Sequence, residues 1–226
     1  MRRNDGRTPP PARPESSSWR RSSTTTSRSS RPATRRGSRN SRAGAAGDGE
    51  PTMKIGILSD SHGRVDRIST AIELLMDNGA ELLLHLGDII DCESIDAMSG
   101  HPSRIVLGNC DWDEAGLRRH ADRTGVVCDH PIGRLDVDGR TLAFTHGHRN
   151  ELMEVALADR VDWLLHGHTH EVRDERIDGT RVINPGALQR ASRYTVGLLN
   201  TADDTLAILE LPKSAANLRR SSRSRS

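Results

Sequence analysis

The stretch KIGILSDSHG, residues 54–63, decides the fold because it joins a short apolar run directly to a polar turn. A few apolar residues bounded by turn residues are typical of a strand that is buried on both faces. Apolar residues then recur at helical spacing from Val65 to Leu75, and Asn78-Gly79 ends that helix. We therefore expect a strand, a polar turn that carries Asp60 and His62, and a helix.

The same unit recurs twice along the chain. A second apolar strand, Leu82 to Leu86, ends in Gly87-Asp88, and a weaker helix is expected from about Glu93 to Met98. A third strand, Arg104 to Leu107, ends in the turn GNCD, residues 108–111. Strands that alternate with helices predict a parallel sheet. In such sheets ligands bind beyond the carboxyl ends of the strands, so the three polar turns are expected to share one site.

The second half of the chain predicts antiparallel strands as well. Two Asp-Gly pairs, Asp138-Gly139 and Asp178-Gly179, each lie between strand-like runs, which is a hairpin signal. The first hairpin leads into Thr145-His146-Gly147-His148. Mixed parallel and antiparallel strands predict an α/β fold of two packed sheets with helices outside. The further elements expected here are a helix over residues 151–159, a strand over 161–165 and a hairpin over 194–211.

Three histidines alternate in the stretch LLHGHTH, residues 164–170. Alternate residues of an extended segment point to the same side, so His166, His168 and His170 are expected to face one cavity. Neutral imidazole is the commonest side-chain metal ligand, which favours a metal site over the alternative of a polar loop after a strand.

Seven polar side chains at the strand ends make one candidate metal centre. They comprise three oxygen donors and four imidazoles, a mixture that suits Mn, Fe or Zn better than Ca. Seven ligands are too many for one tetrahedral ion and suit two ions that share a bridging carboxylate. Paired ions are a device for in-line displacement at phosphorus, in which a bridging water loses a proton and becomes the nucleophile. The seven residues are Asp60, His62, Asp88, Asn109, His146, His166 and His168.

Five motifs occur in a set order over residues 53–211. In that order they resemble the motifs of the calcineurin-like metallophosphoesterase superfamily. The cysteine of the third motif and the later Asn184-Pro185-Gly186 are similar to its small YfcE-type phosphodiesterase branch. The five motifs are Asp60-Ser61-His62, Gly87-Asp88, Gly108-Asn109-Cys110-Asp111, Thr145-His146-Gly147-His148 and His166-Gly167-His168-Thr169-His170.

The resemblance implies a fold, a cofactor and an activity. The implied fold is a two-sheet sandwich flanked by helices, in agreement with the pattern of strands and helices above. The implied cofactor is a pair of divalent ions, Mn²⁺ first, with Fe, Zn, Ni or Mg as alternatives. The implied activity is hydrolysis of a small phosphodiester or nucleotide. The implied ligands are Asp60, His62 and His168 for one ion, Asn109, His146 and His166 for the other, and Asp88 as the bridge.

The proton donor to the leaving group is left open by the resemblance. The larger superfamily usually has a histidine after the ligand asparagine, where this chain has Cys110. A thiol with a pKa of about 8.5 donates a proton more weakly than an imidazolium, so modest turnover or a preference for good leaving groups is expected. His148 is the alternative donor, or a contact to the substrate phosphate. With Asp88 and Asn109, these two residues form the expected catalytic set.

Four further residues have expected roles close to these motifs. His170 is expected to support a metal ligand or to make a structural hydrogen bond. Asp111 is expected to orient a neighbouring ligand, since carboxylates fix imidazole tautomers. His85 interrupts a leucine strand and is expected to be a hydrogen-bonded core histidine. Trp112 is expected either to line the substrate cleft or to pack.

Charge is distributed unevenly along the 226 residues. Residues 1–52 carry twelve arginines and four acids, a net charge of +8, and residues 213–226 carry +5. Residues 53–212 carry −11 and are long enough for one domain with a hydrophobic core. Both basic tails are expected to be disordered. The first tail has three alternatives: a nucleic-acid arm, an organellar transit peptide, or a segment outside the mature protein if translation starts at Met53.

The cysteines and the hydropathy bear on the compartment. Cys92, Cys110 and Cys128 are an odd number without C-x-x-C spacing, so free thiols in a reducing, cytoplasmic compartment are expected. No apolar run reaches the roughly 18 residues of a membrane span, so no membrane partner is expected. The oligomeric state is not predicted.

Two other functions compete with the phosphodiesterase interpretation. One is a non-catalytic scaffold, like the retromer subunit that shares this fold. Scaffold relatives lose catalytic histidines, whereas this chain has all seven ligand positions. The other is a phosphoesterase that associates with nucleic acid through its basic tails. The acidic middle of the chain disfavours a nuclease and favours a small diester or nucleotide.

Overall fold

The computed structural model describes residues 53–137 and 139–212. The expectations for the two basic tails lie outside the described residues, as does the first residue of the Asp138-Gly139 turn. None of the helices in the described part has the length and apolarity that a membrane span requires.

The first sheet contains the three strands that the sequence places before polar turns. Its order is β11-β10-β1-β2-β3-β4, with β1, β2, β3 and β4 parallel and β10 antiparallel to β1. The strands are β1 (Lys54–Leu58), β2 (Leu82–His85), β3 (Ser103–Ile105), β4 (Val127–Cys128), β10 (Thr195–Asn200) and β11 (Thr205–Glu210).

The second sheet is formed by the hairpins of the second half. Its order is β5-β6-β7-β9-β8, and β6, β7 and β9 are parallel while the two edge strands are antiparallel to their neighbours. Asp178 and Gly179 both have positive φ, as the tight turn between β8 and β9 requires. The strands are β5 (Ile132–Val137), β6 (Arg140–Thr145), β7 (Trp163–Leu165), β8 (Val172–Ile177) and β9 (Thr180–Pro185).

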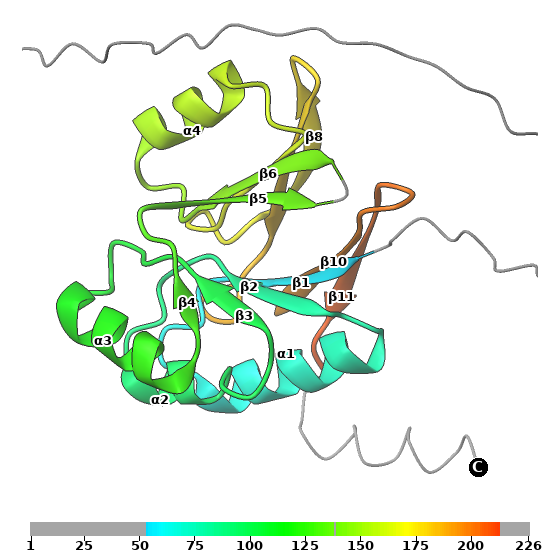
Figure 1. Cartoon of the computed structure of the whole chain (residues 1–226). Coiled ribbons are helices and arrows are strands. Elements are labelled where there is room, and N and C mark those ends of the chain that lie inside the picture. Colours follow the sequence, from blue (N-terminus) through cyan, green and yellow to red (C-terminus); the bar gives the residue numbers. More distant parts are fainter. Residues whose placement is uncertain (1–52, 138, 213–226) are drawn as a thin grey trace, which may run out of the picture. The chain divides into compact units, whose positions relative to one another are not determined.

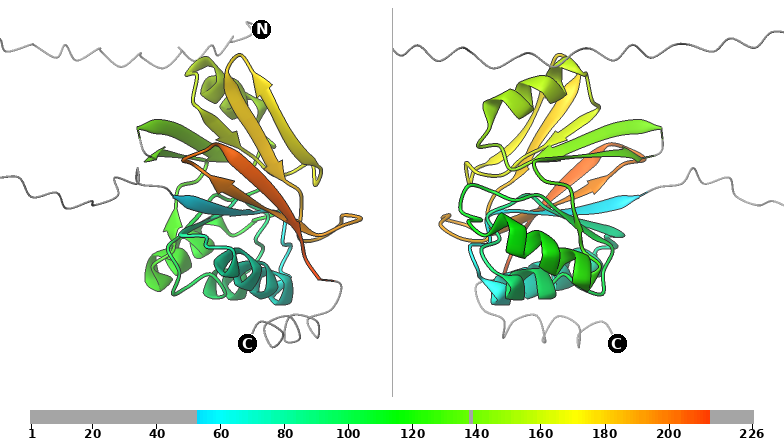
Figure 2. Two further views of the ribbon diagram at one scale, coloured as in Figure 1. Left: turned by 90° about the vertical axis from the view of Figure 1, so that its right-hand side faces the viewer. Right: turned by 60° about the vertical axis from the view of Figure 1, so that its left-hand side comes forward.

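Helices cover the outer faces of both sheets (Figure 1). Three of them, α1 (Val65–Asp77), α2 (Cys92–Asp96) and α3 (Glu114–Thr124), pack on the first sheet through a shared apolar cluster that includes Leu58, Ile95 and Leu117. The helix α4 (Asn150–Ala158) packs on the second sheet through Ala156. The two further views show the same layering (Figure 2). The predicted two-sheet sandwich flanked by helices is confirmed.

The space between the sheets is filled by side chains from both. Ile55 and Ile57 of β1 meet Phe144 and Trp163 of the second sheet, and all four are fully buried. Because side chains alternate along a strand, Gly56 points the other way, toward α1. A Cβ at Gly56 would lie 2.9 Å from the side chain of Leu75, so the glycine permits close helix packing.

Two elements were not predicted. Helix α3 buries only Leu117 and Ala121 and carries charges elsewhere, so its apolar period is weak. Its boundary signals are present, since Asp113 accepts a hydrogen bond from Gly116 N and Gly125 ends the helix with φ +77°. Strand β4 has two residues and is too short for any periodic signal. The other predicted strands and helices are present, with ends shifted by a few residues.

Candidate metal centre

The carboxyl ends of five parallel strands, in two sheets, bring the candidate ligands together. Backbone hydrogen bonds hold the loops after β1 and β2 side by side, from Asp60 N to Gly87 O (3.0 Å) and from His62 N to Asp88 O (2.9 Å). The loop after β7 is tied to the end of β6 by Gly167 N, which donates to His146 O (2.9 Å). Loops from both sheets therefore meet at one edge of the sandwich.

The first group of ligand atoms is formed by Asp60, His62 and His170. His170 Nε2 lies 3.2 Å from Asp60 Oδ1 and 3.5 Å from His62 Nε2. His170 Nδ1 is 3.4 Å from the carbonyl of Arg190, to which it can donate. That hydrogen bond leaves Nε2 as the nitrogen with a free lone pair, and this lone pair faces the group.

The second group is formed around the Asp88 carboxylate. Asp88 Oδ1 accepts a hydrogen bond from Cys110 N (2.9 Å) and lies 3.4 Å from His146 Nε2. Asn109 Oδ1 lies 3.2 Å from the same His146 nitrogen. Asp88 Oδ2 points the other way and lies 3.6 Å from His62 Nε2. The two carboxylate oxygens thus face the two groups.

His146 has the tautomer and charge that a ligand needs. Its Nδ1 is 2.7 Å from the carbonyl of Leu86, a main-chain acceptor, so Nδ1 carries the proton and Nε2 faces Asp88 and Asn109. Burial lowers the pKa of His146 to about 4, so the ring is neutral at pH 7. Burial opposes ionisation of Asp88, but His146 and the Cys110 amide hold the pKa of that carboxyl below its ordinary value.

His168 lies beside His146 and His148. The centroids of the His168 and His146 rings are 5.2 Å apart, and His148 is 6.2 Å from His168. The backbone N–H of His168 donates to Asp60 Oδ2 (3.1 Å). This places the imidazole of His168 on the side of the second group, whereas the sequence interpretation assigned it to the ion of Asp60 and His62.

His166 is not in either group. Its Nδ1 is 3.0 Å from Gly167 O and its Nε2 is 3.3 Å from Arg173 Nη1, so both ring nitrogens face other partners. The segment that follows is not extended, since His168 and His170 have φ of +71° and +61°. The expectation that this segment is extended is therefore wrong, and the alternating spacing does not by itself direct the three side chains.

Part of the site has an unusual backbone conformation. A positive φ is uncommon outside glycine and often occurs at functional sites. Five residues of the two groups have a positive φ, whereas Asn109, His146 and His166 do not. The five are Asp60 (+54°), His62 (+45°), Asp88 (+56°), His168 (+71°) and His170 (+61°).

The donor set fits divalent metal ions. Asp60 Oδ1 is buried and has no hydrogen-bond partner among the described residues, although imidazole nitrogens surround it. Burial raises the pKa of Asp60 to about 6 in the metal-free chain, because removal from water disfavours the charged carboxylate. Gly167 lets the histidine loop approach, since a Cβ there would lie 2.7 Å from Asp60 Oδ2. A cation would satisfy the orphaned oxygen.

Two buried residues hold the ligand loops from behind. Asp111 accepts from the backbone amides of Ile89 (2.8 Å), Ile90 (2.6 Å) and Gly108 (2.7 Å). It therefore fixes the loops that carry Asp88 and Asn109 through their main chain, not through an imidazole as predicted. His85 accepts from Gly87 N (3.2 Å) and donates to Ser61 Oγ (2.9 Å), so the predicted core histidine is confirmed.

The two predicted proton donors lie at the centre. Cys110 Sγ is 3.5 Å from Asn109 Nδ2, and burial and Asp88 raise the pKa of the thiol, so it is protonated at neutral pH. His148 Nε2 accepts from Arg149 Nε (3.3 Å), which leaves the proton on Nδ1. His148 Nδ1 is buried and has no partner among the described residues. Trp112 is 91% exposed, so the alternative that it packs in the core is wrong.

The structure adds contacts at two positions. His170 was expected to support a metal ligand or to make a structural hydrogen bond, and its Nε2 lies 3.2 Å from Asp60 Oδ1. Asn184 was used only as a family motif, but its Nδ2 donates to Gly167 O (2.9 Å) and Thr169 Oγ1 (3.1 Å) and so shapes the histidine loop. The sequence signal for this role of Asn184 was its position at the end of a strand, directly before Pro185-Gly186.

Comparison with known families gives a match over nearly the whole described region. The model of the calcineurin-like phosphoesterase superfamily domain matches residues 53–204. Phosphodiesterase MJ0936 of Methanocaldococcus jannaschii is 31% identical over 157 residues, which are 66% of this chain and 93% of that protein. Phosphodiesterase YfcE of Escherichia coli is 25% identical over 177 residues, 70% of this chain and 92% of that protein.

Solved structures agree with these matches. A structure of an archaeal phosphodiesterase has 30% sequence identity and a TM-score of 0.65, and the alignment covers 70% of this chain and 100% of that one. The structure of YfcE from Escherichia coli has 20% identity and a TM-score of 0.52, which supports the fold. The resemblance to the superfamily and to its YfcE-type branch is confirmed.

Proposed function

Because the chain belongs to the calcineurin-like phosphoesterase superfamily, we propose that it is a phosphodiesterase that uses two divalent metal ions. The position of the Asp88 carboxylate is the observation that supports two ions. Its Oδ1 lies 3.4 Å from His146 Nε2 and its Oδ2 lies 3.6 Å from His62 Nε2. A carboxylate whose two oxygens face two sets of donor atoms would be suited to lie between a pair of ions.

The proposed ligand set exchanges one histidine of the sequence interpretation. His170 takes the place beside Asp60 and His62, and His168 moves to the ion of Asn109 and His146. Mn²⁺ is the preferred metal because carboxylate, amide and imidazole donors occur together. Such ions lower the pKa of water and neutralise the charge on phosphoryl oxygens. The ligands are Asp60, His62 and His170 for one ion, Asn109, His146 and His168 for the other, and Asp88 between them.

His148 and Cys110 are the proposed groups for the leaving oxygen. Arg149 donates to Nε2 of His148, so the ring proton is on Nδ1, a buried atom without a partner in the described part of the chain. Burial lowers the pKa of His148, so the ring acts as a neutral donor at pH 7. The raised pKa of Cys110 keeps its proton as well. Both are weak acids, and this favours substrates with good leaving groups.

The proposed substrate is a small phosphodiester or nucleotide. Residues 53–212 carry a net charge of −11, which repels a long polyanion away from the centre. The basic tails that would favour nucleic acid lie outside the described residues. A small diester needs only the local positive field of the metal centre.

Metal depletion and reloading test this proposal. The chain is treated with a chelator, dialysed, and assayed on bis(p-nitrophenyl) phosphate before and after addition of Mn²⁺. We expect cleavage to disappear and to return with two ions bound per chain. Failure to recover activity while circular dichroism remains native would refute the proposal. A metal content below one ion per chain after reloading would favour the non-catalytic scaffold.

A further inference from the structure

A cavity of about 490 Å³ opens beside the first ligand group. His170 lines it together with Thr169 and Glu171, which come from the same loop. The opposite wall is the segment before β10, with Arg190, Ser192 and Arg193. Polar and cationic side chains thus line one space next to the proposed reaction centre.

Arg190 is the side chain in this cavity whose guanidinium is available to bind a ligand. Its guanidinium has no hydrogen bond or ion pair with any residue in the described ranges 53–137 and 139–212. Its position is nevertheless set by its backbone, because its carbonyl faces His170 Nδ1 at 3.4 Å and its φ is +55°.

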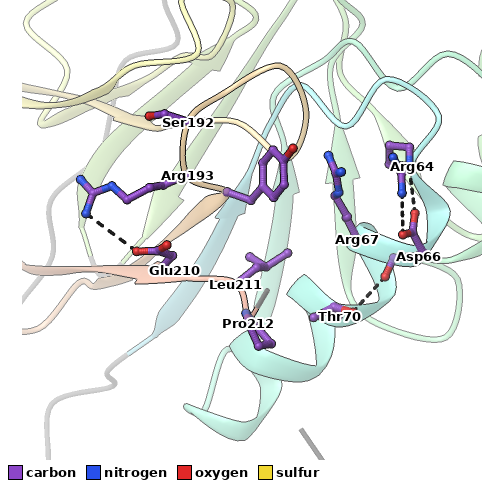
Figure 3. A pocket seen from close by; sticks show the side chains of 10 residues that line it. Arg64, Asp66, Arg67, Thr70, Ser192, Arg193, Glu210, Leu211 and Pro212 are labelled. Atoms are coloured by element: carbon purple, nitrogen blue, oxygen red, sulfur yellow. Dashed lines mark hydrogen bonds and ion pairs between the residues drawn. The ribbon is translucent and has the colours of Figure 1, made fainter. Parts of the chain in front are cut away.

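A neighbouring cavity is also lined by arginines, and it provides a comparison for Arg190. It measures about 420 Å³, and Arg64, Arg67 and Arg193 line it (Figure 3). Arg64 pairs with Asp66 at 2.8 Å, and Arg67 lies 3.7 Å above the Tyr194 ring and donates to Leu188 O. Arg64 and Arg67 therefore already have partners within the protein, unlike Arg190.

Arg193 borders both cavities and adds charge to the first. Its Nη1 is 3.8 Å from Glu210 Oε2, and both side chains are largely exposed, so this pair is weak (Figure 3). Glu171 is the acid that opposes the two arginines in the first cavity. Two arginines and one carboxylate line this cavity, and Glu210 offsets part of the charge of Arg193, so Arg190 is the main positive charge that an anion can approach.

We propose that the cavity beside His170 is a subsite for a second anionic group of the substrate. This inference rests on the proposed function, and it specifies the substrate class as phosphodiesters that carry a further phosphate, as multiply phosphorylated nucleotides do. The planar fork of Arg190 suits bidentate binding of phosphate oxygens, and Ser192 and Thr169 offer hydroxyl donors at the walls. A diester with a single charge leaves this subsite empty.

Binding to the metal-depleted full chain tests the subsite without turnover. Thymidine 3′,5′-bisphosphate and thymidine 5′-monophosphate are titrated separately, and Kd is taken from NMR shift changes. We expect the bisphosphate to bind about tenfold more tightly, in line with one added charge-assisted contact. Arg190→Gln should remove this preference. The control Arg119→Gln, an exposed arginine on α3, should retain it, and the tails are the same in all three proteins.

The outcomes separate this inference from the proposed function. Equal Kd values in the wild-type chain, or a preference that survives Arg190→Gln, would overturn the subsite. Steady-state assays with Mn²⁺ add a second readout, in which Arg190→Gln should raise KM about tenfold for a diester with a second phosphate and change kcat much less. If no diester is cleaved at all, the proposed function fails and the binding experiment still decides the subsite.

Discussion

Asn184 donates a hydrogen bond of 2.9 Å from Nδ2 to the carbonyl of Gly167, and the same nitrogen reaches Thr169 Oγ1 at 3.1 Å. These two bonds span the backbone on both sides of His168. The fully buried amide therefore fixes the turn that presents His168 and His170, although it binds no ion itself.

Asn184→Asp keeps the shape of the side chain and removes its donor. We expect the affinity for Mn²⁺ to fall by about 10- to 100-fold, as when a group that orients a metal ligand is lost. The measurement is competition with a chelator of known affinity. Asn78→Asp, at the exposed end of α1, is the matched control and should bind Mn²⁺ like the wild type. Unchanged affinity in Asn184→Asp would show that the turn holds its shape alone.

The choice between His166 and His170 as a ligand can be measured directly. His170→Ala should lose close to one bound ion per chain, because its Nε2 lies 3.2 Å from Asp60 Oδ1. His166→Ala should keep two ions, since Arg173 and Gly167 are its neighbours. Metal analysis after gel filtration provides the count, and thermal melting shows whether each variant is folded. The reverse result would restore the ligand set that the sequence predicted.

The sequence predicts most residues of the candidate site because strand ends are easy to recognise. Apolar runs that stop at Asp60, Asp88 and Asn109 place these side chains at one edge of a parallel sheet. The histidine loop is different, because its backbone φ values are positive and an alternating pattern has meaning only in an extended chain. The proposed role of Arg190 was also out of reach, because its cavity is formed by two loop segments, around residues 169–172 and 190–195, that only the fold brings together.

His85 makes the stability of the metal-free chain depend on pH. Burial lowers its pKa to about 3, whereas the unfolded chain has an ordinary pKa of 6.5. Between these values the unfolded state binds the additional proton, so the free energy of unfolding falls as the pH is lowered from 6.5. One such proton contributes up to about 1.4 kcal/mol per pH unit.

Urea unfolding of the wild type and His85→Gln, with chelator present, isolates this contribution. The other histidines remain in both proteins, so the difference between the two slopes belongs to His85. We expect the variant to lose stability less steeply between pH 6.5 and 4. Parallel slopes would mean that His85 is protonated in the folded chain, despite the amide of Gly87 that faces its Nδ1.

Asp88→Asn tests the bridging position itself. The amide keeps the size of the side chain and replaces one oxygen with an NH₂ group that cannot bind a cation. We expect turnover to fall below about a tenth of the wild-type value, because loss of a shared ligand weakens both ions at once. Cys110 N can still donate to the remaining oxygen, so the fold should persist. Metal analysis distinguishes the two results that would contradict this prediction. Full turnover with one retained ion would indicate a mononuclear enzyme. Full turnover with two retained ions would show that Asp88 is not the bridging ligand.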